Sequence, residues 1–150
     1  MQADGTLELS LAPVEVAPPA PDEVIVRVEA APINPSDLGL LLAGADLDTA
    51  TVTGPPEHPT LRATIPPAGM RALAGRVGQS LTVGNEGAGT VVGAGASAEA
   101  QALLGKVVAV AVGAMYVQYR NVKASQCLEL PAGTGAADGI SAGLIFPIQA

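Results

Sequence analysis

The chain has 150 residues, 49% of them apolar, which excludes a disordered tail and is enough for one domain with a substantial hydrophobic core. Its formal net charge is −7 and its seven lysines and arginines are scattered, which excludes the basic surface of a nucleic-acid-binding protein. Eighteen glycines and 13 prolines, against two tyrosines and one phenylalanine, favour short strands and turns around an aliphatic core.

The single cysteine leaves the redox compartment open, and the location is inferred from hydropathy. Cys127 is the only cysteine, so the chain cannot form an internal disulfide. The N-terminus has no basic region followed by an apolar segment, and no apolar stretch approaches the length of a membrane span. We therefore expect a cytoplasmic protein without a membrane partner.

The N-terminal third predicts two strands and a short helix. Apolar and polar residues alternate over 6–16 and again over 23–31, as in half-buried strands. Asn34 is suited to cap a helix whose first residue is Pro35, and Gly44 is suited to end it.

The middle of the chain is less regular. No clean period runs over 45–67, which contains two proline pairs, so we interpret this stretch as a long loop. Residues 67–75 predict a second short helix with Met70, Leu73 and Ala74 facing inward.

A glycine-rich turn over 84–89 leads into the C-terminal part. This part predicts four more strands and an ambiguous helix, over 90–94, 106–112, 117–122, 127–130 and 136–150. The whole pattern predicts a mainly β fold, namely a partly open antiparallel barrel with one or two short helices.

The stretch Gly93–Ala98 matches G-x-G-x-x-A, the fingerprint of dinucleotide-binding Rossmann units. Only Glu99–Leu104 separates it from the next glycine and strand, whereas a parallel crossover needs about a dozen residues or more. No acidic residue lies about 20 positions further on to hold a ribose. We interpret the stretch as a connection between antiparallel strands and expect no Rossmann domain in this chain.

A series of short motifs shares its order and spacing with a known family. The motifs read PDEVIVRVEAA at 21–31, INPSD at 33–37, VGNEGAGTVV at 83–92, LGKVVAV at 104–110, GAMYVQY at 113–119 and LELP at 128–131. In this order they resemble the N-terminal, GroES-like domain of the medium-chain dehydrogenase/reductase superfamily.

Within that superfamily the chain is similar to the zinc-independent, quinone-oxidoreductase-like branch. The zinc-dependent branch carries a cysteine near the start of the first helix and a histidine in the glycine-rich turn. Here these stretches read NPSD at 34–37 and GNE at 84–86, while His58 and Cys127 lie elsewhere. Because a catalytic zinc needs three converging N, S or O ligands, the resemblance implies a protein without zinc.

The resemblance also implies a domain organisation. Residues 1–131 would form the GroES-like substrate domain, in which 45–80 is a loop region longer than the family's usual connection. Residues 132–150 would begin the connection to a Rossmann domain that is absent from this chain. We therefore expect the chain alone to be inactive.

In the resembled branch, NADPH delivers a hydride to a quinone or conjugated carbonyl, and the N-terminal domain forms one wall of the cleft. The resemblance implies that Asn34 hydrogen-bonds the nicotinamide ribose or the substrate carbonyl, unless it only caps the helix. Tyr116 would donate a proton, or else be a core or edge residue. Asp37, Asn85 and Glu86 would lie on the same side, Asp37 and Glu86 chiefly as structural groups.

Three readings of the function stay open. The first is an NAD(P)H-dependent oxidoreductase, and the second is a non-catalytic, GroES-like binding or structural module. The third is a lyase or thioester-linked enoyl reductase of the same superfamily. The choice of NADPH over NADH, the substrate and the oligomeric state are not determined, although the resemblance allows a homodimer of the complete protein.

Overall fold

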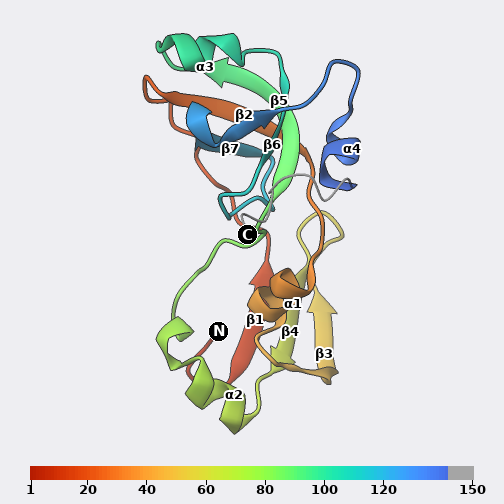
Figure 1. Cartoon of the computed structure of the whole chain (residues 1–150). Helices are drawn as coiled ribbons and strands as arrows, with labels where there is room; N and C mark the ends of the chain where they lie inside the picture. Colours follow the sequence, from red (N-terminus) through yellow and green to blue (C-terminus); the bar gives the residue numbers. More distant parts are fainter. Residues whose placement is uncertain (142–150) are drawn as a thin grey trace, which may run out of the picture. The chain divides into compact units, whose positions relative to one another are not determined.

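The structure is a computed structural model that describes residues 1–141, and the chain divides into two compact units (Figure 1). Unit 1 comprises residues 1–14 and 34–81, and unit 2 comprises residues 15–33 and the chain from residue 82 onward. The chain therefore passes between the units three times.

Unit 2 is built on a five-stranded antiparallel sheet with the strand order β7-β2-β5-β6-β8. In chain order its strands are β2 (Glu23–Ala30), β5 (Gly87–Ala94), β6 (Val107–Val110), β7 (Tyr119–Lys123) and β8 (Cys127–Glu129). The alternation predicted for the second strand is confirmed, because Val24 and Val26 of β2 are fully buried while Arg27 is exposed. This central strand organises the unit, since it pairs with β5 on one side and with β7 on the other.

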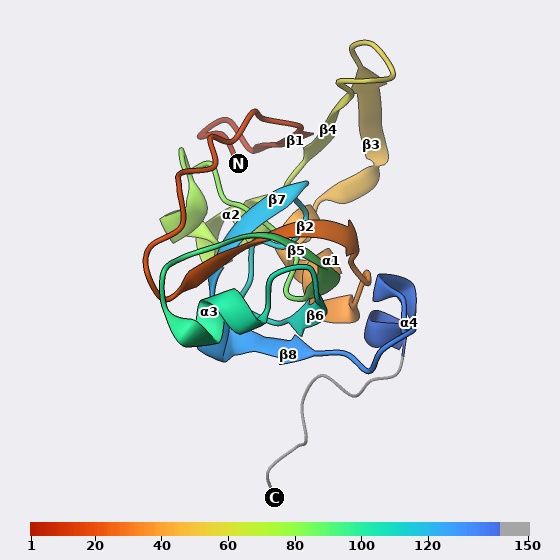
Figure 2. The ribbon, with the colours of Figure 1, turned by 90° about the horizontal axis from the view of Figure 1, so that it is seen from above.

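The two faces of this sheet bury different side chains, as the alternation of β6 requires. Val108 and Val110 belong to the larger hydrophobic cluster, which also includes Leu103, just after helix α3 (Ala98–Ala102). Ala109 points to the opposite face and packs with Ala136 of helix α4 (Ala136–Ser141). Both views show α4 beside this part of the sheet (Figure 2).

Unit 1 contains a three-stranded antiparallel sheet with the order β1-β4-β3. Its elements are β1 (Thr6–Ser10), α1 (Pro35–Leu42), β3 (Asp46–Thr53), β4 (Thr60–Thr64), α2 (Pro67–Ala72) and the 3-10 helix η1 (Ala74–Arg76). A second 3-10 helix, η2 (Ala124–Gln126), belongs to unit 2. The core of unit 1 is small and centres on Leu7, Ala43 and Ile65, with Met70 and Leu73 packed against it.

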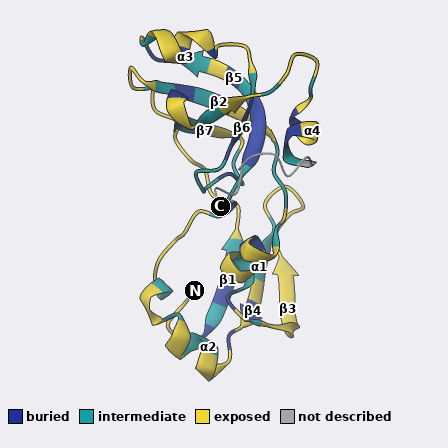
Figure 3. Cartoon of the chain, in the orientation of Figure 1, coloured by how far each residue is buried: buried dark blue, intermediate teal, exposed yellow. Residues whose placement is uncertain are grey.

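The loop predicted over 45–67 is wrong, because β3 and β4 form a hairpin there. All eight residues of β3 are exposed, so the strand has no inside–outside alternation from which it could be recognised (Figure 3). Its register with β4 is also interrupted between Asp46 and Thr51. The pairing depends instead on backbone hydrogen bonds and on Thr49, whose Oγ1 accepts a 2.8 Å bond from the Thr64 N–H.

Other details differ from expectation. Among residues 1–141 the chain forms four short α-helices rather than one or two, and the mainly β class is confirmed with two antiparallel sheets, neither of which closes into a barrel. Met70 and Leu73 face the core as predicted, but Ala74 is exposed. No helix in the described part of the chain has both the length and the apolar character to cross a membrane.

Candidate functional site

The five candidate site residues divide between the two units. Asn34 and Asp37 lie at the start of α1 in unit 1. Asn85, Glu86 and Tyr116 lie in unit 2, around the turn that leads into β5.

The N-terminus of α1 is held by a reciprocal capping arrangement. Asn34 has extended backbone angles and Pro35 is the first helical residue, as the sequence predicts. The Asp37 carboxylate accepts a 2.9 Å hydrogen bond from the Asn34 N–H, and the Asp37 N–H donates a 2.9 Å bond to the Asn34 carbonyl. Asp37 is fully buried. This geometry supports the structural role expected for Asp37, because its carboxylate satisfies an N–H group at the helix start.

The turn that carries Asn85 is fixed by its pairing with a second loop of unit 2. The Tyr116 N–H donates to the Val83 carbonyl at 3.0 Å, and the Met115 N–H donates to the Gly84 carbonyl at 3.1 Å. The Gly113 N–H donates to the carbonyl of Asn85 itself at 3.1 Å. The backbone of Asn85 is therefore held in one conformation, which is what a group that must present a side chain needs.

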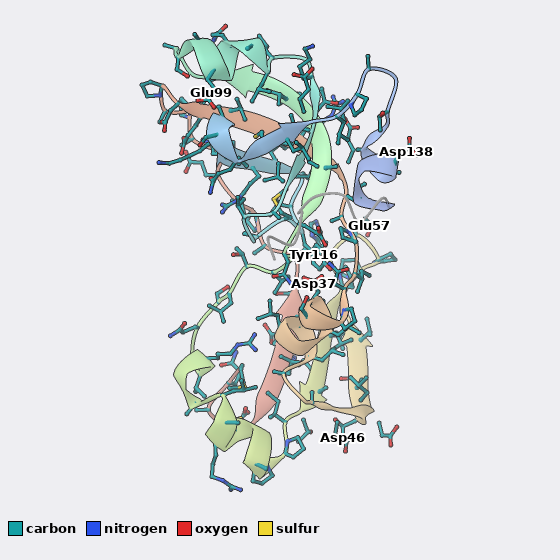
Figure 4. All side chains as sticks on the ribbon, in the orientation of Figure 1. Asp37, Asp46, Glu57, Glu99, Tyr116 and Asp138 are labelled. Atoms are coloured by element: carbon teal, nitrogen blue, oxygen red, sulfur yellow. The ribbon has the colours of Figure 1, made fainter. Side chains whose placement is uncertain are left out.

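Tyr116 is a half-buried residue rather than part of the core (labelled in Figure 4). Its hydroxyl donates a 2.8 Å hydrogen bond to the Pro32 carbonyl, 84 residues earlier in the chain. Its ring lies against Gly84, which has a φ of +92°. Reasoning from sequence did not identify Pro32 or Gly84 as part of this arrangement, because the carbonyl is a backbone group and the contact is long-range.

Glu86 lies between this turn and the first residue of β5, Gly87, and is half-buried like Asn85. Gly87 is closely packed, since a Cβ there would lie 3.1 Å from the Ala30 carbonyl oxygen and 3.2 Å from Met115 Cε. The chain is therefore tightly packed directly after the two candidate polar residues. Their roles toward a substrate stay predictions.

The glycine-rich stretch Gly93–Ala98 does not fit a dinucleotide pyrophosphate. The Gly95 N–H donates to the Glu23 carbonyl at 2.7 Å and the Ser97 N–H to the Pro21 carbonyl at 2.8 Å, so both are already used. A Cβ at Gly95 would overlap backbone carbonyl oxygens of the segment before β2. The following helix has only five residues, and β5 and β6 are antiparallel. The predicted connection between antiparallel strands is confirmed, with a short helix inserted.

The single thiol, Cys127, lies away from the candidate residues in sequence. Burial, with a smaller contribution from the charge of Glu99, raises the pKa of Cys127 to about 11, and its Sγ donates to the Lys123 carbonyl at 3.6 Å. His58 is exposed in the turn between β3 and β4. Among residues 1–141 no three His, Cys, Asp or Glu side chains come together in a way that could hold a metal ion.

Comparison with known proteins identifies relatives by fold alone. No protein-family model matches the chain, and no curated protein sequence matches it. Several solved structures do match. A candidate NADPH:quinone reductase from Mesorhizobium loti is 26% identical, with a TM-score of 0.52 over 84% of this chain.

Two further matches are less similar in sequence and show the fold alone. JamJ enoyl reductase is 18% identical with a TM-score of 0.57 over 87% of this chain. The Escherichia coli quinone oxidoreductase, solved in complex with NADPH, is 22% identical with a TM-score of 0.51 over 87%. The chain spans 30% of the first of these three proteins, 33% of the second and 31% of the third. The match to the reductase from Mesorhizobium loti confirms the resemblance to an N-terminal, GroES-like domain of the medium-chain dehydrogenase/reductase superfamily, and hence to oxidoreductases.

Proposed function

We propose that this chain is the substrate-side domain of an NADPH-dependent oxidoreductase that reduces a quinone or a conjugated carbonyl without zinc. The observation that carries the proposal is the likeness in fold to a candidate NADPH:quinone reductase over 84% of the chain, at 26% identity. The likeness to enoyl reductases at lower identity supports the same fold but does not choose between substrates.

The bound cofactor would supply the hydride, and the residues of this chain would position and shield the reacting groups. We assign Asn34 and Asn85 to the wall that faces nicotinamide and substrate. Asn34 has extended backbone angles and its N–H donates to the Asp37 carboxylate, while the carbonyl of Asn85 accepts a bond from the Gly113 N–H. A fixed backbone at each asparagine provides the preorganisation that orienting a substrate requires. Glu86 would order the turn rather than transfer a proton.

Most of the NADPH contacts would come from a second domain. The one glycine fingerprint of this chain has its Gly95 and Ser97 N–H groups bonded within the sheet, so it offers no cradle for a pyrophosphate. We therefore propose that residues 1–131 are the substrate domain, that 132–150 begin the connection to the cofactor domain, and that the chain alone has no activity. A cytoplasmic location and a homodimer of the complete protein belong to the same proposal.

The proposal of zinc independence depends on the residues at the two positions where the zinc-dependent branch places its ligands. The first of these lies within the stretch NPSD at 34–37 and the second is occupied by Asn85, so neither supplies the thiolate or imidazole that zinc prefers. The only thiol is Cys127, whose raised pKa disfavours the thiolate that binds metals.

The test is a titration of the 150-residue chain with NADPH, followed by nicotinamide fluorescence, beside a quinone-reduction assay of the complete enzyme with and without a strong chelator. We expect no saturable binding to the chain alone and unchanged turnover of the complete enzyme in chelator. Inactivation by chelator with recovery on adding zinc would contradict zinc independence. A complete protein that forms a large ring and has no turnover would favour the non-catalytic GroES-like module instead.

A second measurement concerns Asn34. If Asn34→Ala lowers turnover per folded molecule of the complete enzyme, its amide acts on cofactor or substrate. If the variant loses about 1 kcal/mol of stability with unchanged turnover, Asn34 only caps α1.

A further inference from the structure

We propose that Tyr116 is a positioning residue that joins two of the connections between the units, and that its hydroxyl is not a proton donor to the substrate. The chain leaves unit 2 after Ile33 and re-enters it at Thr82. Tyr116 bonds to both connections within unit 2, because its hydroxyl donates to the Pro32 carbonyl at 2.8 Å and its N–H donates to the Val83 carbonyl at 3.0 Å.

The ring of Tyr116 packs against Gly84, where the lack of a side chain leaves room for it. A Cβ at Gly84 would lie 2.5 Å from Tyr116 Cδ1 and 2.6 Å from Tyr116 N, closer than real Cβ contacts come. Gly84 also has a φ of +92°, which side-chain-bearing residues rarely adopt. The ring therefore occupies the volume that any other residue at position 84 would fill, and the two positions depend on each other.

The loop that carries Tyr116 is held in a conformation that the surrounding structure must maintain. Ala114 has a φ of +57°, which is uncommon for a residue with a Cβ. The next residue, Met115, is fully buried in the core of unit 2. Two further hydrogen bonds, from Gly113 to Asn85 and from Met115 to Gly84, pair the loop with the turn before β5.

The consequence concerns the two asparagines of the proposed function, on which this inference rests. Pro32 precedes Asn34 by two residues, and Val83 precedes Asn85 by two residues. One residue thus holds the backbone just ahead of both asparagines, through its hydroxyl at Pro32 and through its main-chain N–H at Val83. The Tyr116 hydroxyl donates its hydrogen bond to the Pro32 carbonyl. A role as proton donor to a substrate would therefore require breaking the bond that holds this connection.

The first test is amide hydrogen exchange of the 150-residue chain with Tyr116→Phe, which removes only the hydroxyl. The loss of one hydrogen bond predicts exchange about two- to tenfold faster at the amides of Gly113, Met115 and Tyr116. The amide of Gly105, bonded to Val91 at 3.0 Å, should be unchanged. Tyr119→Phe, at an exposed tyrosine of β7, is the matched control. Unchanged exchange at all three amides would overturn the proposal that Tyr116 holds the two connections.

A second variant reaches the same arrangement from the other side. Gly84→Ala should displace the ring without removing the hydroxyl and should accelerate exchange at the same amides. Gly105→Ala is its control, because Gly105 also has a positive φ, of +78°, but open space around it. Equal effects of the two alanines would mean that backbone strain alone acts and would overturn the dependence on the ring.

The role toward the substrate is tested in the complete enzyme. For Tyr116→Phe we expect KM for quinone or NADPH to rise several-fold with kcat within about twofold of the wild type, because positioning is loosened. A fall in kcat of about a hundredfold or more, with loss of one limb of the pH–rate profile, would show a proton donor and overturn the proposal. A wild-type enzyme without NADPH-dependent turnover would instead refute the proposed function. The exchange experiment would still show whether Tyr116 holds the two connections.

Discussion

The two units differ in how much apolar side chain their sheets bury. The larger cluster of unit 2 joins ten buried residues drawn from four strands, a helix and the loops between them, whereas the described core of unit 1 joins three. The contrast is clear in individual strands, since Ala88 and Val91 of β5 are buried while no residue of β3 is (Figure 3).

The two units are stabilised mainly by different interactions. Burial of apolar surface contributes about 25 cal/mol per Å², and unit 2 gains most of it. Unit 1 depends more on backbone pairing, in which a hydrogen bond contributes about 1 kcal/mol net. We therefore expect unit 1 to unfold at lower urea concentration than unit 2. Tyr116 and Tyr119 both lie in unit 2, so tyrosine fluorescence should report a later transition than far-UV circular dichroism. Coincident transitions would contradict two separate stabilities.

The largest change in the stability of either unit is expected from a substitution in the core of unit 2. Met115→Ala removes a fully buried side chain that packs against Gly87, and should lower the free energy of unfolding of unit 2 by about 3 kcal/mol. Urea denaturation followed by tyrosine fluorescence measures it. Val52→Ala, at a position of β3 that is 66% exposed, is the control and should change stability by less than about 0.5 kcal/mol.

The next effect is on the reactivity of Cys127. Burial raises the pKa of this thiol from the ordinary 9.0 to about 11, so at pH 8 a disulfide reagent should react about a hundredfold more slowly with the folded protein than with the urea-unfolded chain. The folded state holds the proton more tightly, so the associated stability is present below about pH 9 and is lost as the pH rises toward 11. Equal reaction rates at pH 8 would mean that the thiol is not shielded.

A smaller effect is expected at the glycine fingerprint. Gly95→Ala places a Cβ against backbone carbonyl oxygens of Ala20 and Pro21 and should destabilise unit 2 by about 2 kcal/mol, because backbone must move. Gly75→Ala in unit 1, where nothing lies within 4 Å, is the control and should have no destabilising effect. A Gly95 variant of full stability would show that this glycine is free to serve another purpose, such as ligand binding.

The smallest effect is expected at the start of α1. Asp37→Asn weakens the bond to the Asn34 N–H and should cost unit 1 about 1 kcal/mol. Circular dichroism should detect the change in the first transition, while the tyrosine signal of unit 2 stays constant. Asp48→Asn, at an exposed residue of β3, serves as the control. A shift of the tyrosine transition instead would show that the two units unfold together.

Features that depend on residues within a few positions of one another could be predicted from the sequence. The alternation of Val24 and Val26 with charged residues marks a half-buried strand, and Asn34-Pro35 followed by Asp37 marks a helix start, because both patterns act through neighbours within a few positions. The order of such motifs also carried the resemblance that the fold comparisons confirm.

Other features depend on contacts between residues far apart in the chain and could be seen only in the folded protein. Strand β3 is held by backbone bonds to β4 rather than by a buried face, so no periodicity could reveal it. The hydroxyl of Tyr116 meets the carbonyl of Pro32 across 84 residues, and a backbone carbonyl carries no residue-specific signal. The donors of Gly95 and Ser97 are unavailable to a phosphate for the same reason, because distant backbone groups of the chain already accept their hydrogen bonds.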